Sequence, residues 1–238
     1  MNRLLTPAFV LHRRNFEEAS LLVELLTRDR GRVGAVARGA RKSRRHRGGL
    51  LQPYVPLQVS LSGRGQLATL GQLEAEGPPI LTVGSRPALI ALYLNELLLR
   101  LTARDDPNET LFRCYLKTLV GLATGAAAPV LRRFELALLA SQGYAVALTH
   151  DAVTGEPVQA TQHYRYEVEE GPVETVQISA ETVRGETLLC LARGEDGDAA
   201  VQREARQLLG EVLRHYLGPK PLRSRQLYQQ MIQPEIQS

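Results

Sequence analysis

The densest group of chemically useful side chains lies in residues 38–47, where six of ten residues are Arg or Lys. No Asp or Glu occurs in residues 31–73, so this charge has no acidic neighbour in the sequence. Arginine offers a planar fork of donors that can hold two phosphate oxygens at once. Gly39, Gly48 and Gly49 would leave the segment mobile enough to follow a flexible backbone. We predict contact with nucleic-acid phosphates; a solvated loop with excess charge is the alternative.

The predicted nucleic-acid surface combines these cations with neighbouring basic residues and one aromatic residue: Arg32, Arg38, Arg41, Lys42, Arg44, Arg45, Arg47, Tyr54 and Arg64. Aromatic side chains are few in residues 1–80, which contain Phe9, Phe16 and Tyr54 and no Trp. Base stacking should therefore contribute little. Tyr54 stands near two prolines, and a structural role suits it equally well. Binding carried by phosphates should be independent of base sequence and sensitive to salt.

Two further groups of cations stand beside apolar residues. The first combines one apolar helix face with two flanking arginines: Leu131, Arg132, Arg133, Phe134 and Leu138. The second is a run of cations beside a predicted helix start: Lys220, Arg223 and Arg225. An acidic peptide with an apolar tip would need this combination of charge and apolar surface. The alternative is that Phe134 belongs to the core and the charges are solvated.

Catalytic signatures are missing from the sequence. It contains no P-loop, no dinucleotide-binding glycine motif and no zinc-protease motif, which excludes an ATPase of the Walker type. His150 and Asp151 are adjacent, but nothing nearby completes a hydrolytic site, and we interpret His150 as a turn residue. We expect no enzyme activity and no cofactor. A metal-independent nuclease is the enzymatic alternative, and it would cleave the DNA that it binds.

Charge is unevenly distributed along the chain. Residues 1–80 hold 13 Lys and Arg against 6 Asp and Glu, a net charge of +7, whereas residues 81–238 carry −3. Such a basic first third indicates a polyanionic partner. No apolar run approaches the roughly 18 residues of a membrane-spanning helix, and the first residues lack the order of a secretory signal. Two cysteines far apart in the sequence predict neither a disulfide nor a zinc site, so we expect a cytoplasmic protein.

The first 80 residues predict five short strands, separated by turn signals, at residues 8–13, 20–27, 32–38, 55–62 and 67–74. One long connection follows the third strand. This pattern fits a small closed barrel, of which the OB fold is the commonest nucleic-acid-binding example. An SH3-like barrel fits the same periodicity nearly as well.

Helical periodicity begins after the glycine–proline break at residues 77–79. Ser85 and Asn108 can cap the starts of the first two helices. The predicted helices cover residues 89–101, 108 to about 121–125, 130–141, 180–191, 199–217 and 224–231. Alternating residues 163–169 and 173–178 predict a β-hairpin. The predicted fold class is α+β: a five-stranded OB-fold barrel domain at residues 1–80, followed by an α-helical domain at residues 81–238. The helical domain carries the β-hairpin insertion at about residues 144–178.

Several strings in combination resemble the RecO family, and the similarity covers nearly the whole chain. In chain order they are AFVLHR (8–13), SLLV (20–23), GRVGAVARGAR (31–41), LQPYVPL (51–57), YLNEL (93–97), LRRFELALL (131–139) and KPLRSR (220–225). The form is similar to that of gammaproteobacteria. The resemblance implies an amino-terminal OB domain, followed by a helical domain, in a protein of recombinational DNA repair.

The resemblance also implies activities and partners. Proteins of this family bind single- and double-stranded DNA and anneal complementary strands, and they use no ATP themselves. With the partner RecR they help RecA replace single-strand-binding protein (SSB), whose acidic carboxyl-terminal tail they bind. We expect that tail at Arg132 and Arg133 with Leu131 and Phe134, or alternatively at the cations of residues 220–225. A nucleoid-associated protein of the cytoplasm, with no membrane partner, is the corresponding expectation. The alternative is an RNA-binding or ribosome-associated OB-fold protein.

One departure from the family concerns zinc. The resemblance implies a four-cysteine zinc module in many relatives, and in this chain the four positions hold Asp151, Thr154, Thr175 and Ile178. Threonine and isoleucine cannot replace thiolates in a tetrahedral zinc site. We therefore predict a hairpin that persists without metal.

Overall fold

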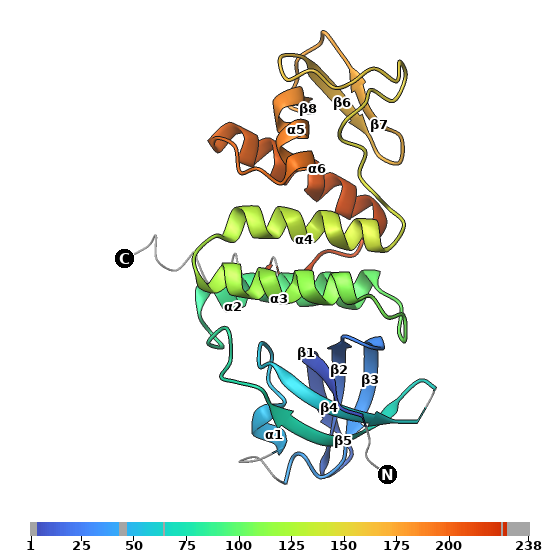
Figure 1. The fold of residues 1–238 in the computed structure, drawn as a ribbon, viewed down its shortest axis with the longest axis vertical. Coiled ribbons are helices and arrows are strands. Elements are labelled where there is room, and N and C mark those ends of the chain that lie inside the picture. Colours follow the sequence, from blue (N-terminus) through green and yellow to red (C-terminus); the bar gives the residue numbers. More distant parts are fainter. Residues whose placement is uncertain (1–3, 43–46, 64, 225, 228–238) are drawn as a thin grey trace. The chain divides into compact units, whose positions relative to one another are not determined.

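The computed structural model describes residues 4–42, 47–63, 65–224 and 226–227 of the 238-residue chain. The chain divides into two compact units, Met1–Gly125 with Pro221–Ser238, and Ala126–Lys220 (Figure 1). Among the described residues, the first unit contains the barrel with one short helix and two longer helices, and the second contains three helices and a small sheet. None of the helices in the described part of the chain is long and apolar enough to cross a membrane.

The barrel consists of β1 (Thr6–Phe16), β2 (Ser20–Thr27), β3 (Gly31–Ala37), β4 (Leu57–Ser62) and β5 (Ala68–Ala75), with the short helix α1 (Arg47–Leu50) between β3 and β4. It closes in the order β1-β2-β3-β5-β4. Only β3 and β5 pair in parallel; the other pairs are antiparallel. This strand order, with a helix after the third strand, is that of the OB fold. The predicted five-stranded OB barrel and the α+β class are confirmed.

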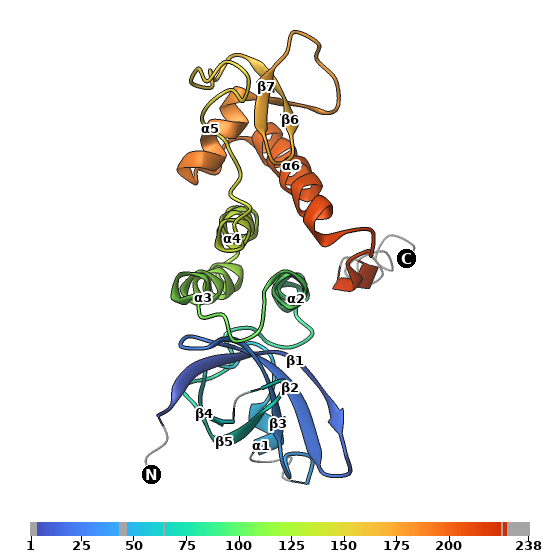
Figure 2. The ribbon, with the colours of Figure 1, turned by 90° about the vertical axis from the view of Figure 1, so that its right-hand side faces the viewer.

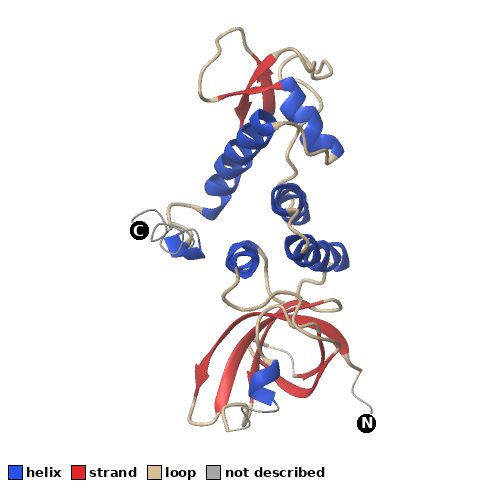
Figure 3. Cartoon of the chain, turned by 90° about the vertical axis from the view of Figure 1, so that its left-hand side faces the viewer, coloured by secondary structure: helices blue, strands red, loops and turns tan. Residues whose placement is uncertain are grey.

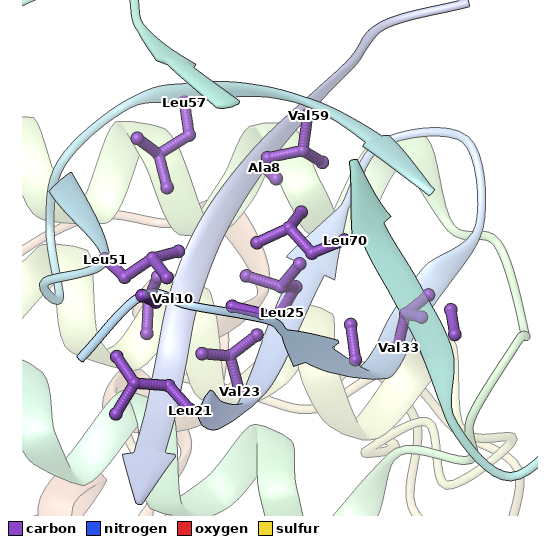
Figure 4. Close-up of a cluster of buried hydrophobic side chains, with 14 of the residues drawn as sticks. Ala8, Val10, Leu21, Val23, Leu25, Val33, Leu51, Leu57, Val59 and Leu70 are labelled. Atoms are coloured by element: carbon purple, nitrogen blue, oxygen red, sulfur yellow. The ribbon is translucent and has the colours of Figure 1, made fainter. Parts of the chain in front are cut away.

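Alternating residues on each strand fill the barrel interior (Figure 4). Val23 and Leu25 on β2, Leu57 and Val59 on β4, and Leu70 on β5 are each at most 2% exposed. Because successive side chains point to opposite faces of a strand, this spacing of two produces one continuous apolar core. The core fixes the positions of the loops at the ends of the barrel.

The helices α2 (Arg86–Leu101) and α3 (Glu109–Ala123) lie across one end of the barrel (Figures 1 and 2). Ser85 and Asn108 cap them, as predicted, by accepting hydrogen bonds from Ala88 N and Leu111 N. A buried polar chain joins the elements: Tyr115 Oη donates to Asn95 Oδ1 (2.7 Å), and Asn95 Nδ2 donates to the Leu11 carbonyl (3.0 Å). The Tyr115 hydroxyl and the Asn95 amide thus each have a hydrogen-bond partner in the interior.

The second unit contains α4 (Ala127–Ser141), β6 (His163–Glu167), β7 (Gly171–Glu174), β8 (Thr182–Arg184), α5 (Gly185–Arg193) and α6 (Ala199–Leu217). Its sheet has the order β7-β6-β8. Figure 3 shows the strands of the chain in red and the helices in blue. The predicted hairpin is present as β6 and β7, and α6 has the predicted bounds.

Of the predicted helices, the one at residues 180–191 begins later in the structure, and the one at residues 224–231 is described only in part. The helix expected at residues 180–191 is wrong at its start, because Val183 and its neighbours pair with β6 before α5 begins. Gly185 permits this close packing, since a side chain there would meet the Gln159 carbonyl. The helix expected at residues 224–231 falls largely outside the described residues.

Candidate nucleic-acid interface

Residues 38–42 form a turn that is fastened to the connection between β1 and β2. Arg41 N donates to the Ala19 carbonyl (3.0 Å), and its Nη1 donates to the carbonyls of Glu17 (2.9 Å) and Glu18 (3.0 Å). Ala40 is fully buried, and Gly39 supplies a left-handed backbone (φ +71°). This part of the basic segment therefore has a fixed conformation. Gly48 and Gly49, expected to loosen it, lie in α1.

The cations of this turn remain accessible. Arg38, Arg41 and Lys42 are exposed, and no ion pair involves them among the described residues. Three other predicted cations lie outside the described residues: Arg44, Arg45 and Arg64. Arg47 begins α1, and its side chain is also outside the described part. Their contacts with nucleic acid stay predictions.

Exposed cations on β1 join this end of the barrel, and the sequence interpretation missed them. The predicted first strand ends at residue 13, but β1 continues to Phe16 and pairs with β2 along its length. Arg14 lies opposite Leu22, which in turn lies opposite Val36 near the end of β3. Arg13 Nη1 donates to the carbonyls of Gly48 (3.2 Å) and Leu51 (2.9 Å), which attaches α1 to β1.

The same end of the barrel contains two acids that the linear sequence separates from the basic segment. Glu17 and Glu18 form the β1–β2 turn against which Arg41 packs, and both are exposed. The described cations outnumber them: Arg13, Arg14, Arg38, Arg41 and Lys42. The surface, which we call the basic barrel end, is therefore positive without being free of acids.

The aromatic residues of the barrel differ in accessibility. Tyr54 is 1% exposed, its hydroxyl donates to the Ala88 carbonyl (2.8 Å), and burial raises its pKa. The structural role is thus favoured over the stacking role for Tyr54. Phe9 is buried against Phe112 and Tyr115 of α3. Phe16 is only half-buried, at the end of β1.

Arg32 does not belong to the accessible surface. Its guanidinium donates to the Thr102 carbonyl (2.7 Å) and pairs with Glu24 (3.1 Å), and the side chain is 15% exposed. Glu24 also pairs with Arg104. Although residues 31–73 contain no acid, Arg32 has an acidic neighbour from β2, because β2 and β3 pair and bring Glu24 opposite Gly34. Arg32 ties the barrel to the segment that follows α2.

In the second unit, the predicted apolar face of α4 lies mostly in the core. Phe134 and Leu138 are fully buried and Leu131 is half-buried, as in the core alternative for Phe134. The predicted Arg132 and Arg133, together with Pro129 and Leu136 of α4, line a shallow depression that is partly open to solvent. Its walls come from α4, α5, α6 and the loop between α5 and α6: Pro129, Arg132, Arg133, Leu136, Leu191, Gly194, Glu195, Asp196, Val201, Gln202 and Ala205. We call it the α4–α6 pocket.

Both arginines of this pocket have partners within the unit. Arg132 forms an ion pair with Glu135 (2.6 Å), whose side chain is only 2% exposed. Arg133 donates to the Gly194 carbonyl through Nη2 (2.6 Å) and Nε (3.2 Å). Because Gly194 ends α5, this places a cation at the negative end of that helix. The pocket thus combines an apolar floor with two guanidinium groups.

The second predicted group of cations is divided between the two units. Lys220 ends the second unit, Arg223 belongs to the first, and both are exposed; Arg225 lies outside the described residues. The backbone N–H groups of Arg223 (3.0 Å) and Ser224 (2.8 Å) donate to the Glu96 carboxylate. Burial acts to raise the pKa of Glu96, but the hydrogen bonds from Ser224 and Arg223 outweigh it and lower the pKa.

The four positions of the zinc module do not fit a zinc site. The Asp151 carboxylate accepts hydrogen bonds from the N–H groups of Val153 (2.9 Å), Thr154 (2.8 Å) and Glu174 (2.6 Å). Bonds from Thr154 and Glu174 lower the pKa of Asp151. Ile178 is 70% exposed. No group of three or more His, Cys, Asp or Glu suited to a metal ion occurs in the described part of the chain.

A closed OB barrel with a positive end is typical of proteins that bind nucleic-acid backbones. Residues 1–78 match the family model described as recombination protein O, N terminal. Residues 87–226 match the model described as recombination protein O, C terminal. The chain belongs to the RecO family of DNA repair proteins.

Relatives named DNA repair protein RecO cover almost the whole chain. The protein of Nitrosococcus oceani is 46% identical over 235 residues, covering 97% of this chain and 95% of the relative. That of Alkalilimnicola ehrlichii is 47% identical over 238 residues, covering 96% and 92%. That of Shigella flexneri is 42% identical over 227 residues, covering 94% and 93%.

Proposed function

We propose that this protein is a non-catalytic recombination mediator. It binds the phosphates of single- and double-stranded DNA at the basic barrel end and anneals complementary strands. It binds the carboxyl-terminal tail of SSB in the α4–α6 pocket and acts with RecR to promote loading of RecA. The observation that carries the proposal is the cluster of exposed cations at one end of an OB barrel in a RecO-family chain.

Phosphate contact explains how such a surface could promote annealing. Two DNA strands repel each other, and cations that neutralise phosphates lower this repulsion. The turn at residues 38–42 is held by Arg41, so Arg38 and Lys42 are presented in a fixed orientation on it. Such contacts are made to the backbone, and they are therefore independent of base sequence.

The experiment replaces five cations of the basic segment by alanine: Arg41, Lys42, Arg44, Arg45 and Arg47. If about five phosphates are neutralised, the logarithmic salt slope for single-stranded DNA should be near −3.5. Wild-type affinity should then fall about a hundredfold between about 50 and 200 mM salt. The variant should lose most DNA binding and annealing while its fold survives.

A control variant with Arg113→Ala and Lys117→Ala removes exposed cations from α3 of the same unit and should bind DNA normally. Normal DNA binding by the fivefold variant would contradict the proposal. So would a preference for RNA over DNA of the same sequence without annealing, which would favour the RNA-binding alternative. Cleavage of the bound DNA would favour the nuclease.

The α4–α6 pocket supports the proposed SSB contact. An acidic tail that ends in an aromatic ring gains about 2–3 kcal/mol by burying that ring. Leu136, Leu191 and Val201 supply apolar surface. Arg132 and Arg133 line the same depression and can meet the carboxylates of the tail.

A further inference from the structure

The α4–α6 pocket is lined by acids as well as by arginines. Arg132 and Arg133 contribute from α4, whereas Glu195 and Asp196 contribute from the loop between α5 and α6. Both acids are exposed, and Glu195 pairs only with Arg193 at the surface (3.4 Å) among the described residues. An acidic peptide that enters this pocket therefore meets two negative charges beside the two positive ones.

The loop that carries these acids is bounded by glycines with left-handed backbones, Gly194 (φ +68°) and Gly197 (φ +59°). It is held over the pocket by three contacts. Arg133 donates to the Gly194 carbonyl, Gln202 donates to the Asp196 carbonyl, and Glu195 N donates to the Cys190 carbonyl (2.9 Å). Two of the residues that hold this loop, Arg133 and Gln202, also line the pocket.

The Arg133 N–H groups that donate to the Gly194 carbonyl are the same groups that would donate to an acidic ligand in the pocket. Two nitrogen atoms of the Arg133 guanidinium already face one neutral carbonyl. A carboxylate forms a stronger hydrogen bond with a guanidinium than a carbonyl does, because both partners are charged. An acidic ligand can therefore replace Gly194 at Arg133, and the loop must then release one of its anchors.

We propose that the acidic loop, residues 194–197, restrains the α4–α6 pocket as an internal competitor. Its Gly194 carbonyl occupies Arg133, and Glu195 and Asp196 repel the acids of an incoming peptide. The loop thereby lowers the affinity of the pocket for acidic peptides in proportion to their charge. This inference rests on the proposed function of the pocket as an acidic-peptide site.

The test compares the wild type with a Glu195→Gln/Asp196→Gln variant in titrations of two labelled peptides. One peptide is acidic and ends in phenylalanine; the other has amides in place of its acids. At low salt the variant should bind the acidic peptide about two- to thirtyfold more tightly, the range expected for two exposed charge contacts. It should bind the amide peptide as the wild type does. The gain should disappear at high salt, because exposed charges are then screened.

A matched control, Glu170→Gln/Glu174→Gln, removes the same charge from exposed positions of the second unit that do not line the pocket. It should leave both affinities unchanged. Equal or weaker binding of the acidic peptide by the loop variant would overturn the inference, and so would an equal gain in the control. If neither the wild type nor any variant binds the acidic peptide, the proposal that this pocket binds acidic peptides fails. DNA binding, measured in parallel, is independent of that outcome.

Discussion

Phe16 and Tyr54 show that exposure of a single side chain decides its role at the basic barrel end. Tyr54 carries the more polar ring, but its hydroxyl is bound to Ala88 in the interior. Phe16 lies opposite Ser20, next to the pair of Leu21 with Ala37, and its ring is partly accessible. An accessible ring beside cations is suited to stacking on an unpaired base.

We therefore predict that Phe16→Ala weakens binding of single-stranded DNA by about 1–3 kcal/mol, roughly five- to hundredfold, as loss of one base stack does. Duplex DNA should be bound as before, because its bases are already stacked. Phe16→Tyr should retain the effect of the ring. Fluorescence titrations measure the affinity of each variant for single-stranded and for duplex DNA. An equal loss of affinity for duplex DNA would contradict the stacking role.

Asp151 connects the turn at residues 151–154 with the end of β7, and it does so as a charged acceptor. Hydrogen bonds from Thr154 and Glu174 hold its pKa below the ordinary value. Its contribution to the free energy of unfolding is therefore present above the pKa of the unfolded state, about 3.9. It is lost as the pH falls through the lower folded value.

Asp151→Asn should reduce the free energy of unfolding at pH 7 by about 1–3 kcal/mol, because an amide nitrogen would face an N–H donor. The difference from wild type should shrink at about pH 3, where Asp is becoming neutral. Chemical denaturation at the two pH values measures this. Glu156→Gln, at an exposed position two residues after this turn, is the control and should change little. A difference that does not depend on pH would show that the charge of Asp151 has no part in it.

The substitution of Asp151, Thr154, Thr175 and Ile178 at the four zinc positions leads to a prediction about metal. The purified protein should contain no stoichiometric zinc, and chelators should leave its melting temperature unchanged. The reason is that the Asp151 carboxylate already accepts hydrogen bonds from backbone N–H groups. Elemental analysis and thermal unfolding measure both. One zinc per chain would show that other residues supply the ligands.

At the scale of elements, the sequence predicted what local physics determines. Alternation revealed the barrel strands, and the capping residues Ser85 and Asn108 revealed the starts of α2 and α3. It did not reveal the second half of β1, since Arg13 and Arg14 interrupt the apolar alternation. That half is stabilised by pairing with β2, which is a contact between segments and leaves no local signal. The ion pair of Glu24 with Arg32 was not predicted for the same reason, because it depends on the pairing of β2 with β3.

The turn at residues 38–42 gives a prediction at this scale, because Arg41 both carries charge and holds the turn through the carbonyls of Glu17 and Glu18. Arg41→Lys keeps the charge but loses the planar fork that reaches two carbonyls. DNA affinity should fall a few-fold, about 1 kcal/mol, while the salt slope stays unchanged because the number of cations is the same. Lys42→Arg is the control. A reduced slope would mean that Arg41 contributes to binding mainly as a phosphate contact.

At the scale of the whole molecule, the compact units do not follow the change in sequence pattern at residues 77–79. The helices α2 and α3 belong to the barrel unit, because Phe112 and Tyr115 pack on Phe9, and Asn95 binds the Leu11 carbonyl. Arg223 and Ser224, which follow the second unit in the sequence, also belong to this unit, and their N–H groups donate to the Glu96 carboxylate. Such contacts join residues more than 80 positions apart, so hydrophobic periodicity carries no trace of them. The basic barrel end and the α4–α6 pocket consequently lie in different units.

This separation predicts that the two proposed ligands can be lost independently. One arginine bound to a carboxylate is worth about 1.5–3 kcal/mol. Arg133→Ala, and likewise Arg132→Ala, should therefore weaken binding of the SSB tail at least about tenfold. Binding of bare DNA should stay nearly intact, because its cations belong to the barrel unit. Titrations of labelled tail peptide and of bare DNA against each variant measure the two affinities.

The contacts of the two arginines make Arg133 the cleaner probe. Removing Arg132 leaves the Glu135 carboxylate, 2% exposed, without this guanidinium, so Arg132→Ala should also lower stability. Removing Arg133 breaks two hydrogen bonds to the Gly194 carbonyl at the end of α5 but leaves no buried charge without its partner. Tail binding and DNA binding that fall together in Arg133→Ala would indicate one shared basic surface. Unchanged tail binding in both variants would favour the alternative site at residues 220–225, where Lys220 and Arg223 are exposed.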